Sequence, residues 1–399
     1  MGCNFRTRMS KKILFISHST SRTGAPVLLL QFLRWLKTNT DLSFATLVGD
    51  AGPLFADFEA LAETRLLNPR LTMVDRVTRK LVGSTSWIRV MEERQKKWCR
   101  NKKYDLVYSN TICALDEMEL LSQAGYPVVC HVHELDYALQ LLVGYEKFGK
   151  TLPFIHHFIA GSKAVHDYLS TRWLVPESKL SLVHEFTVPR KENTSLTQAR
   201  SSTRAELGLA HDDILVGACG TLEWRKGSDL FIQIASEMRK NPKGSKLRFL
   251  WVGGKTQFES MRFLHDMNKC GLGEIVTVVE TCPNYVDYLS AMDIFALTSR
   301  EDPFPLVMLD AASLGLPIVC FDSSGGGPEF VEQDAGLVAP YLNIEAFASH
   351  LLTLAEYPEV RRRMGEKGAE KVRTRYTIDR QAPKLLQVIS DVCGRTAGN

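Results

Sequence analysis

The sequence predicts an α/β protein made of two domains, each built on a parallel β-sheet. Three observations support this. Short apolar runs alternate with helix-forming segments along most of the chain, which is the order that produces parallel strands joined by helices. At 399 residues the chain exceeds the size of one typical core. A polar, strand-poor stretch at residues 188–203 separates two such series and predicts a linker.

The first series predicts an N-terminal domain over residues 11–190. Its first apolar run, residues 11–19, predicts a buried strand, and residues 23–37 predict the helix that follows. Gly24 would lie in the turn and Pro26 at the first helical position, where a missing N–H costs little. We expect six or seven strands in this domain. The further runs are residues 44–49, 104–110, 127–135, 158–162 and 180–186.

The second series predicts another Rossmann-like domain over residues 204–375. Two such units in tandem leave a cleft between the carboxyl edges of their sheets. Residues 376–395 predict an amphipathic helix that has no sheet of its own to cover, so we expect it to cross back to the first domain. The strands of this series are expected at residues 214–220, 247–254, 275–280, 294–299, 317–321 and 336–340.

The composition is typical of a soluble globular protein, with 45% hydrophobic and 24% charged residues. No apolar run approaches the roughly 20 residues that cross a bilayer. The basic N-terminus lacks the apolar core of a secretory signal, so we expect a cytoplasmic location. Nine scattered cysteines without a Cys-x-x-Cys pair predict reduced thiols, and the absence of His-Glu-x-x-His and Asp-x-Asp argues against a metal site.

The segment between Arg65 and Lys103 is strongly basic, with twelve lysines and arginines against three acids. Trp87 and Trp98 are interleaved with these charges, which suggests basic amphipathic helices. Such a segment is either a solvated helix face or a landing surface for anionic lipid head groups or a polyanionic acceptor. Nucleic acid is a less favoured partner, because nothing here resembles a nucleic-acid-binding module.

The stretch at residues 299–320 carries the strongest site signal. A predicted strand ends in a polar turn containing Glu301 and Asp302, and Pro303 and Pro305 suit the entry of a helix. A strand that opens into a helix N-terminus presents free N–H groups to an anion. Asp310 lies eight residues after Asp302, about two helical turns, so a ligand along the helix could meet both acids. Ordinary helix caps are the alternative explanation.

Two further turns suit an anionic ligand. Arg225 and Lys226 stand in a strand-to-helix turn that ends at Gly227, with Ser228 able to cap the next helix. Cations in such a turn suit a diphosphate, although an exposed basic turn has the same pattern. The glycine-rich turn at residues 323–331, which includes Gly326, could wrap an anion with its amides.

Histidines mark the first domain. His131 and His133 lie on one face at the predicted carboxyl end of a strand, followed by Glu134, and open α/β sheets bind ligands at that edge. Their alternative role is that of satisfied core histidines. Gly24 allows either a close approach of backbone to a phosphate or simply a tight turn.

The ordered motifs GAPVLLLQFL, HVHEL, CGTLEWRKGSDLFIQIA, FLWVGG, SREDPFPLVMLDAASLGLPIV and GGGPEFVEQDAGLVAP resemble the large retaining glycosyltransferase family 4. The resemblance covers residues 11–376, and the segment between Arg65 and Lys103 matches least. It implies the GT-B architecture, in which two Rossmann-like domains face each other across a cleft. It also implies transfer of a sugar from a nucleotide diphosphate sugar with retention at the anomeric carbon, without a cofactor or a bound metal.

The resemblance also implies roles for individual residues. The family's paired acids fall on Asp302, for the donor sugar, and Asp310, for the ribose. The first-domain histidine falls on His133, near the sugar, and the glycine loop falls on Gly24. The remaining donor-binding positions are Arg225, Lys226, Glu301, Pro303, Phe304, Pro305, Leu306 and Gly326.

The chain departs from the family pattern at three positions. Both acids are Asp where Glu is usual, so Glu301 is an alternative to Asp302, and Thr221 stands where many members have Arg. The expected acceptor is a glycan, polysaccharide or glycolipid, and we expect no nucleic-acid partner. Two other functions fit the same fold: a non-catalytic nucleotide-sugar-binding subunit of a transferase, and a nucleotide-sugar epimerase.

Overall fold

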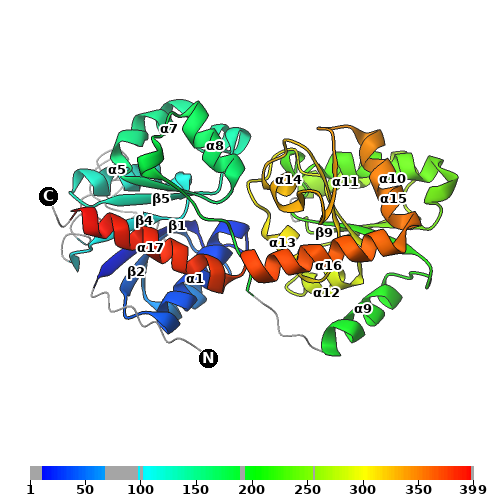
Figure 1. Ribbon diagram of the computed structural model, residues 1–399, viewed down its shortest axis with the longest axis horizontal. Helices are drawn as coiled ribbons and strands as arrows, with labels where there is room; N and C mark the ends of the chain where they lie inside the picture. The colour runs from blue at the N-terminus through cyan, green and yellow to red at the C-terminus, as the bar shows by residue number, and fades with distance from the viewer. Residues whose placement is uncertain (1–10, 68–97, 99–101, 189–193, 255–256, 397–399) are drawn as a thin grey trace, which may run out of the picture. The chain divides into compact units, whose positions relative to one another are not determined.

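The computed structural model describes residues 11–67, 98, 102–188, 194–254 and 257–396 (Figure 1). The chain forms two compact units. Unit 1 contains the chain up to Gly161, residues 165–183 and the C-terminal part from Gln381, whereas unit 2 contains residues 162–164 and 184–380. Most of the basic segment between Arg65 and Lys103 lies outside the described residues, and so does the lipid surface predicted for it.

Unit 1 is built on a seven-stranded parallel sheet in the order β3-β2-β1-β4-β5-β6-β7. The predicted strands are confirmed, and β3 is an addition. Its sequence, ETRL, is only partly buried, so it lacks the apolar run that identified the others. The strands are β1 (Lys12–Ser19), β2 (Ser43–Asp50), β3 (Glu63–Leu66), β4 (Leu106–Ser109), β5 (Val128–Val132), β6 (His157–Ala160) and β7 (Leu180–Leu182).

The first helix of unit 1, α1 (Gly24–Asn39), begins two residues before Pro26, the predicted first helical position. Thr23 is its N-cap residue, so Gly24 is the first helical residue and Pro26 the third. Proline is tolerated there because the N–H groups of the first turn have no partner within a helix. Among the described residues, the other α-helices with residues in unit 1 are α2 (Phe55–Leu61), α5 (Leu115–Gln123), α6 (Asp136–Leu142), α7 (Tyr145–Thr151), α8 (Lys163–Arg172) and α17 (Ile378–Thr396).

Helix α17, red in Figure 1, belongs to unit 1 from Gln381 onwards. One side of it is apolar and buried, including Leu385 and Ile389. Near its end, the guanidinium of Arg395 donates to the carbonyl of Ser178 at 3.4 Å. The last helix of the chain is therefore part of the core of unit 1.

Unit 2 is built on a six-stranded parallel sheet in the order β10-β9-β8-β11-β12-β13. Its six strands match the six predicted runs. The four inner strands of this sheet are buried at nearly every position, which fits parallel strands covered on both faces, whereas the edge strands β10 and β13 are partly exposed. The strands are β8 (Ile214–Cys219), β9 (Leu247–Val252), β10 (Val276–Val279), β11 (Ile294–Leu297), β12 (Ile318–Phe321) and β13 (Gly336–Ala339).

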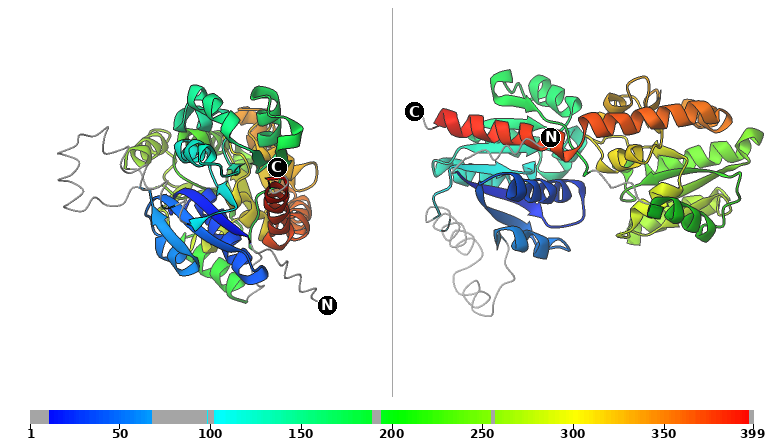
Figure 2. Two further views of the ribbon diagram at one scale, coloured as in Figure 1. Left: turned by 90° about the vertical axis from the view of Figure 1, so that its left-hand side faces the viewer. Right: turned by 60° about the horizontal axis from the view of Figure 1, so that its bottom comes forward.

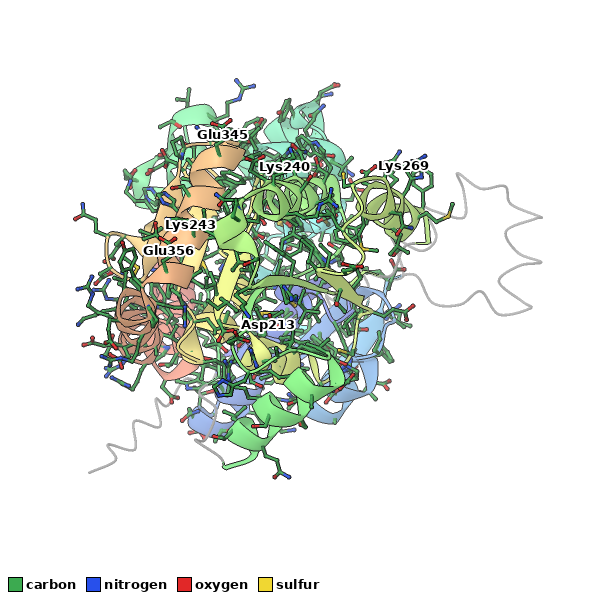
Figure 3. All side chains as sticks on the ribbon, turned by 90° about the vertical axis from the view of Figure 1, so that its right-hand side faces the viewer. Asp213, Lys240, Lys243, Lys269, Glu345 and Glu356 are labelled. Carbon is green, nitrogen blue, oxygen red and sulfur yellow. The ribbon has the colours of Figure 1, made fainter. Side chains whose placement is uncertain are left out.

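Helices cover the sheet of unit 2, as the views in Figure 2 show. Its core includes Trp251, Phe231 and Phe249, whose rings meet edge to face. At the surface in Figure 3, Lys243 and Glu356 form an exposed ion pair of 2.8 Å. The helices are α9 (Thr194–Glu206), α10 (Ser228–Lys240), α11 (Gln257–Lys269), α12 (Tyr285–Ala291), α13 (Leu306–Ser313), α14 (Gly326–Val331), α15 (Ile344–Glu356) and α16 (Pro358–Arg375).

The prediction of a linker throughout residues 188–203 is wrong, because α9 begins at Thr194. This helix is polar and is held by ion pairs instead of an apolar stripe. Arg200 and Arg204 contact the two carboxylate oxygens of Asp293 at 2.6 and 3.0 Å. The same Asp293 also accepts from the backbone N–H of Leu215 at 2.8 Å, which connects α9 to the start of β8.

Candidate functional site

The basic turn of unit 2 follows β8 as a short 3₁₀ helix, Trp224–Lys226. Gly227 ends it in a left-handed conformation with φ 69°, and a Cβ there would lie 1.9 Å from the carbonyl oxygen of Thr298. Only glycine fits this position without a shift of backbone. Ser228 is the first residue of α10 and not its cap, because Gly227 occupies the N-cap position.

The basic turn is joined to the turn that follows β11. The N–H of Arg300 donates to the carbonyl of Arg225 at 2.8 Å, and the hydroxyl of Thr298 donates to the carbonyl of Lys226 at 3.1 Å. This contact is possible because β8 and β11 are neighbours in the sheet. Two segments that are about 75 residues apart in the sequence therefore form one surface at the carboxyl edge of the sheet.

Lys226 and Asp302 form an ion pair at this edge. Asp302 is only 5% exposed, and the hydroxyl of Ser299 donates to the same carboxylate oxygen at 3.3 Å. An ammonium held in partly dry surroundings interacts more strongly with an anion than one in water. A phosphate that reaches this place would compete with Asp302 for Lys226.

Arg225 contacts the backbone of the acidic turn. Its guanidinium donates to the main-chain carbonyl of Glu301 at 2.9 Å and to the carboxylate of Glu223 at 3.0 Å. The structure thus brings Arg225, Lys226, Glu301 and Asp302 together, as the sequence predicted for a donor site.

Gly326 braces Asp302 through the backbone. Asp302 and Gly325 form an isolated β-bridge, and the N–H of Gly326 donates to the carbonyl of Asp302 at 3.0 Å. A Cβ on Gly326 would lie 2.2 Å from the carbonyl oxygen of Pro303. Its glycine character is therefore explained by close packing of two loops, and its N–H is directed at Asp302.

Helix α13 starts at Leu306 with Pro305 as its N-cap residue, and Phe304 is buried just before it. Asp302 precedes this helix by four residues, whereas Asp310 lies within it, so the two acids belong to different elements. That one ligand meets both acids stays a prediction. The first N–H groups of α13 remain at the edge of the sheet, close in sequence to the acidic turn, where a helix start favours an anion.

Asp310 is 7% exposed, and both of its carboxylate oxygens accept hydrogen bonds from protein hydroxyls. Tyr285 donates to one oxygen at 2.6 Å and Thr187 to the other at 2.7 Å. Neither Tyr285 nor Thr187 lies in a motif that predicts a contact with Asp310. Thr187 comes from the segment that forms an isolated β-bridge with Thr377, far from α13 in the sequence.

In unit 1, Asn110 links His133 to Ala25, the residue after Gly24. The amide nitrogen of Asn110 donates to the carbonyl of Ala25 at 2.8 Å, which directs the amide oxygen at Nε2 of His133, 3.2 Å away. Nε2 of His133 is therefore the protonated nitrogen in the neutral ring. Sequence reasoning missed Asn110, although its position directly after a buried strand was a signal.

His131 is buried next to His133. Its Nδ1 lies 2.7 Å from the hydroxyl of Tyr108, and its ring centroid is 4.1 Å from that of His133. Burial lowers the pKa of His131 well below its usual range, and His133 adds to this effect. The pKa of His18 is also lowered, mainly by burial and in addition by electrostatic repulsion from His133. The imidazoles of His131 and His18 are therefore neutral at pH 7.

Glu134 is buried beside this group. Burial raises the pKa of its carboxyl, while bonds from the N–H of His133 at 2.9 Å and the hydroxyl of Thr111 at 3.0 Å oppose that rise. Both oxygens thus accept from residues of the same sheet edge. Glu134 holds the end of β5 and the segment after β4 in place.

A separate cavity of about 540 Å³ lies between α5, α6 and α7 in unit 1. Ion pairs of Lys147 with Asp116 and Lys150 with Glu146 line it. It contains none of the residues that the sequence predicted for the site. Across the described part of the chain, no group of three or more His, Cys, Asp and Glu is placed to hold a metal ion, and no helix there has the length and apolar character of a membrane span.

Residues 199–371 match the family model described as glycosyl transferases group 1. The match covers less than half of the chain. The matched residues include Arg225, Lys226, Asp302 and Asp310, whereas His133 and Gly24 lie outside them.

Curated relatives are similar in sequence to parts of this chain. The O-antigen biosynthesis glycosyltransferase WclY of Escherichia coli is 25% identical over 230 residues, which are 55% of this chain and 61% of that protein. The D-inositol 3-phosphate glycosyltransferase of Nocardia farcinica is 29% identical over 171 residues, which are 42% and 38% of the two chains. The matches therefore cover less than two thirds of these relatives.

Solved structures match almost the whole chain and confirm the GT-B fold. Anabaena Alr3699/HepE in complex with UDP and glucose has a TM-score of 0.76 at 19% identity and covers 95% of this chain and 99% of its own. The sucrose-phosphate synthase of Thermosynechococcus elongatus has a TM-score of 0.76 at 20% identity and covers 96% and 100%. Both neighbours have the two Rossmann-like parallel-sheet domains predicted from the sequence.

Proposed function

We propose that the protein is a retaining glycosyltransferase that uses a nucleotide diphosphate sugar as donor and needs no metal ion. The observation that carries this proposal is the contact of the Arg225–Lys226 turn with Asp302, next to the start of α13. The group 1 match supports it. So do the names of the relatives and the presence of UDP and glucose in the HepE complex.

The charges of this surface suit the departure of a nucleoside diphosphate. As the bond from sugar to phosphate breaks, negative charge grows on the phosphate oxygen and positive charge on the sugar ring. Lys226, Arg225 and the first N–H groups of α13 would stabilise the negative charge without a change in their positions. Lys226 would exchange its contact with Asp302 for one with the diphosphate.

Asp302 and His133 complete the proposed chemistry. Released from Lys226, Asp302 could accept hydrogen bonds from hydroxyls of the donor sugar. His133 would act near the sugar through Nε2, which carries the proton in the neutral ring and which Asn110 orients. We favour front-face attack, in which the leaving phosphate accepts the proton of the acceptor hydroxyl.

The acceptor we propose is a glycan, polysaccharide or glycolipid, used by a protein that is cytoplasmic or bound at the inner face of a membrane. The basic character of the sequence between Arg65 and Lys103 supports the membrane part of the proposal. Binding to anionic vesicles should then weaken with salt. Equal binding to neutral vesicles, or none to either, would contradict this part alone.

A panel of nucleoside diphosphates and their sugars tests the function directly. The true donor should raise the melting temperature, because a ligand bound only to the native state stabilises it. Lys226→Ala and Arg225→Ala should each remove most of that shift and of turnover, whereas Lys243→Ala, a surface change in the same unit, should leave both unchanged. Product anomers identified by NMR test retention, and turnover after treatment with EDTA tests metal independence.

Two outcomes would contradict the proposal in different ways. Donor binding without turnover, even with a mixture of acceptors, would favour a non-catalytic nucleotide-sugar-binding subunit. Full turnover by Lys226→Ala would show that the diphosphate does not bind at this turn.

A further inference from the structure

The side chain of Arg300 links three elements of unit 2. Arg300 lies in the turn after β11, and its side chain is only 10% exposed. Its guanidinium donates to the two carboxylate oxygens of Asp229, in the first turn of α10, at 2.7 Å each. It also donates to the main-chain carbonyl of Trp224 at 2.7 Å and lies over the Trp224 ring, 4.6 Å from its centroid. Arg300 therefore joins the turn after β11 to the basic turn after β8 and to the start of α10.

The basic turn is held by Arg300 through two successive carbonyl groups. The carbonyl of Trp224 accepts from the side chain of Arg300, and the carbonyl of Arg225 accepts from its main-chain N–H at 2.8 Å. Lys226 is the next residue, and Gly227 ends the turn in its left-handed conformation. The position of the backbone that carries both cations of the proposed diphosphate site thus depends on Arg300.

We propose that Arg300 and Asp229 are positioning residues of the diphosphate site. They keep the backbone of the basic turn fixed while the ammonium of Lys226 exchanges Asp302 for the diphosphate, and neither of them contacts the donor. Cations that are already in place lose little free energy to ordering when the anion arrives. This inference rests on the proposed function, because it concerns how the donor of that reaction is bound.

An arginine suits this role because of the shape of its guanidinium. The planar group forms two parallel hydrogen bonds with a carboxylate and has further N–H groups for a carbonyl. Lysine carries the same charge on a compact ammonium at the end of a flexible chain, so Arg300→Lys keeps the charge and loses the fixed geometry. Because binding groups need to lie within about 0.5 Å of their productive positions, we expect a looser basic turn to bind a diphosphate less tightly.

A purely electrostatic role of the same two residues is the alternative explanation. In that case Arg300 attracts the anion and Asp229 repels it, so removal of the carboxylate charge in Asp229→Asn should strengthen binding. A positioning role predicts a change of the opposite sign. The neutral amide holds the guanidinium less firmly than the carboxylate does, so the basic turn becomes looser and binding weakens.

The test compares the binding of nucleoside diphosphates by variants of the full chain. Dissociation constants would be measured by calorimetry for UDP, ADP, GDP and CDP with the parent, Arg300→Lys and Asp229→Asn. For every nucleotide that the parent binds, we expect about tenfold weaker binding by Arg300→Lys and about threefold weaker binding by Asp229→Asn. The side chain of Asp229 is 40% exposed, so Asp229→Asn keeps the test decisive if Arg300→Lys does not fold.

Arg204→Lys is the matched control, because Arg204 forms a similar network at the opposite edge of the same sheet. Its guanidinium donates to the carboxylate of Asp293 at 3.0 Å and to the carbonyl of Asp213 at 2.6 Å, just before β11 and β8 begin, and its side chain is 15% exposed. Both arginine variants should lower the melting temperature of the protein. Only Arg300→Lys should weaken binding, whereas Arg204→Lys should bind each nucleotide within about twofold of the parent.

Three results would overturn this inference and leave the proposed function intact. They are binding by Arg300→Lys within about twofold of the parent, binding by Asp229→Asn that is tighter than that of the parent, and a loss of affinity in Arg204→Lys equal to that in Arg300→Lys. Binding of none of the four nucleotides by the parent would overturn both the inference and the proposed function.

Discussion

Lys226→Met removes the ammonium of the ion pair with Asp302 but keeps most of the length of the side chain. The side chains of Lys226 and Asp302 are 18% and 8% exposed. Removal of one partner of a buried ion pair costs about 3–5 kcal/mol, because the other charge is left buried and unpaired. Since water reaches part of Lys226, we expect the lower end, about 3 kcal/mol of the free energy of unfolding of unit 2.

A second variant separates the lost attraction from the unpaired charge. Lys226→Met with Asp302→Asn removes both charges, so we expect it to recover about 2 kcal/mol relative to Lys226→Met alone. The measurement is native-state hydrogen exchange of β11 and α13 in low urea, which reports the local opening free energy of this part of unit 2.

Lys243→Met is the control, because its pair with Glu356 lies at the surface in Figure 3 and exposed pairs contribute little. If Lys226→Met changes exchange no more than Lys243→Met does, the buried pair does not stabilise unit 2 as expected. A double variant less stable than Lys226→Met would also contradict the role of the unpaired charge.

Three further predictions concern the supports of the fold. As the pH falls below about 6.5, the free energy of unfolding should fall by up to about 1.4 kcal/mol per pH unit because of His131, since the unfolded chain binds a proton that the buried ring does not. Urea titrations at several pH values should show this slope, and His131→Phe should reduce it. Asp293→Ala should cost about 2–4 kcal/mol and expose α9 to proteases, since two arginines lose their carboxylate partner and one N–H loses its acceptor; protection equal to the parent would contradict this. Gly227→Ala should destabilise far more than Gly208→Ala in thermal melts, because both have positive φ but only Gly227 has a carbonyl oxygen within 1.9 Å of the added Cβ.

The strands were predictable because each local run carries its own signal. In β8 and β12, apolar residues fill nearly every position, as parallel strands covered on both faces require. The half-buried β3 lacks that pattern and was not predicted. The sequence of helix α9 predicts a linker, because the stability of this helix depends on Asp293, about 90 residues further along the chain, and not on an apolar stripe of its own.

The candidate site also contains parts that the sequence predicts and parts that it does not. Local motifs identified the Arg225–Lys226 turn, the acidic turn at Asp302 and the start of α13, because glycine, proline and charge patterns mark turns and helix ends. The contacts among them follow from β8 lying next to β11, which is a property of the sheet. The partners of Asp310 cannot be predicted from the sequence, because Thr187 is 123 residues away and a single threonine carries no sequence signal.

The place of α17 affects how the protein is made on the ribosome. Unit 1 contains the first residues of the chain and also its last helix, with Leu385 and Ile389 in its core. Domains usually fold one after another as they emerge during synthesis, starting from the N-terminus. Here unit 2 is complete in sequence first, and unit 1 must wait with part of its apolar surface uncovered until translation reaches the end of α17.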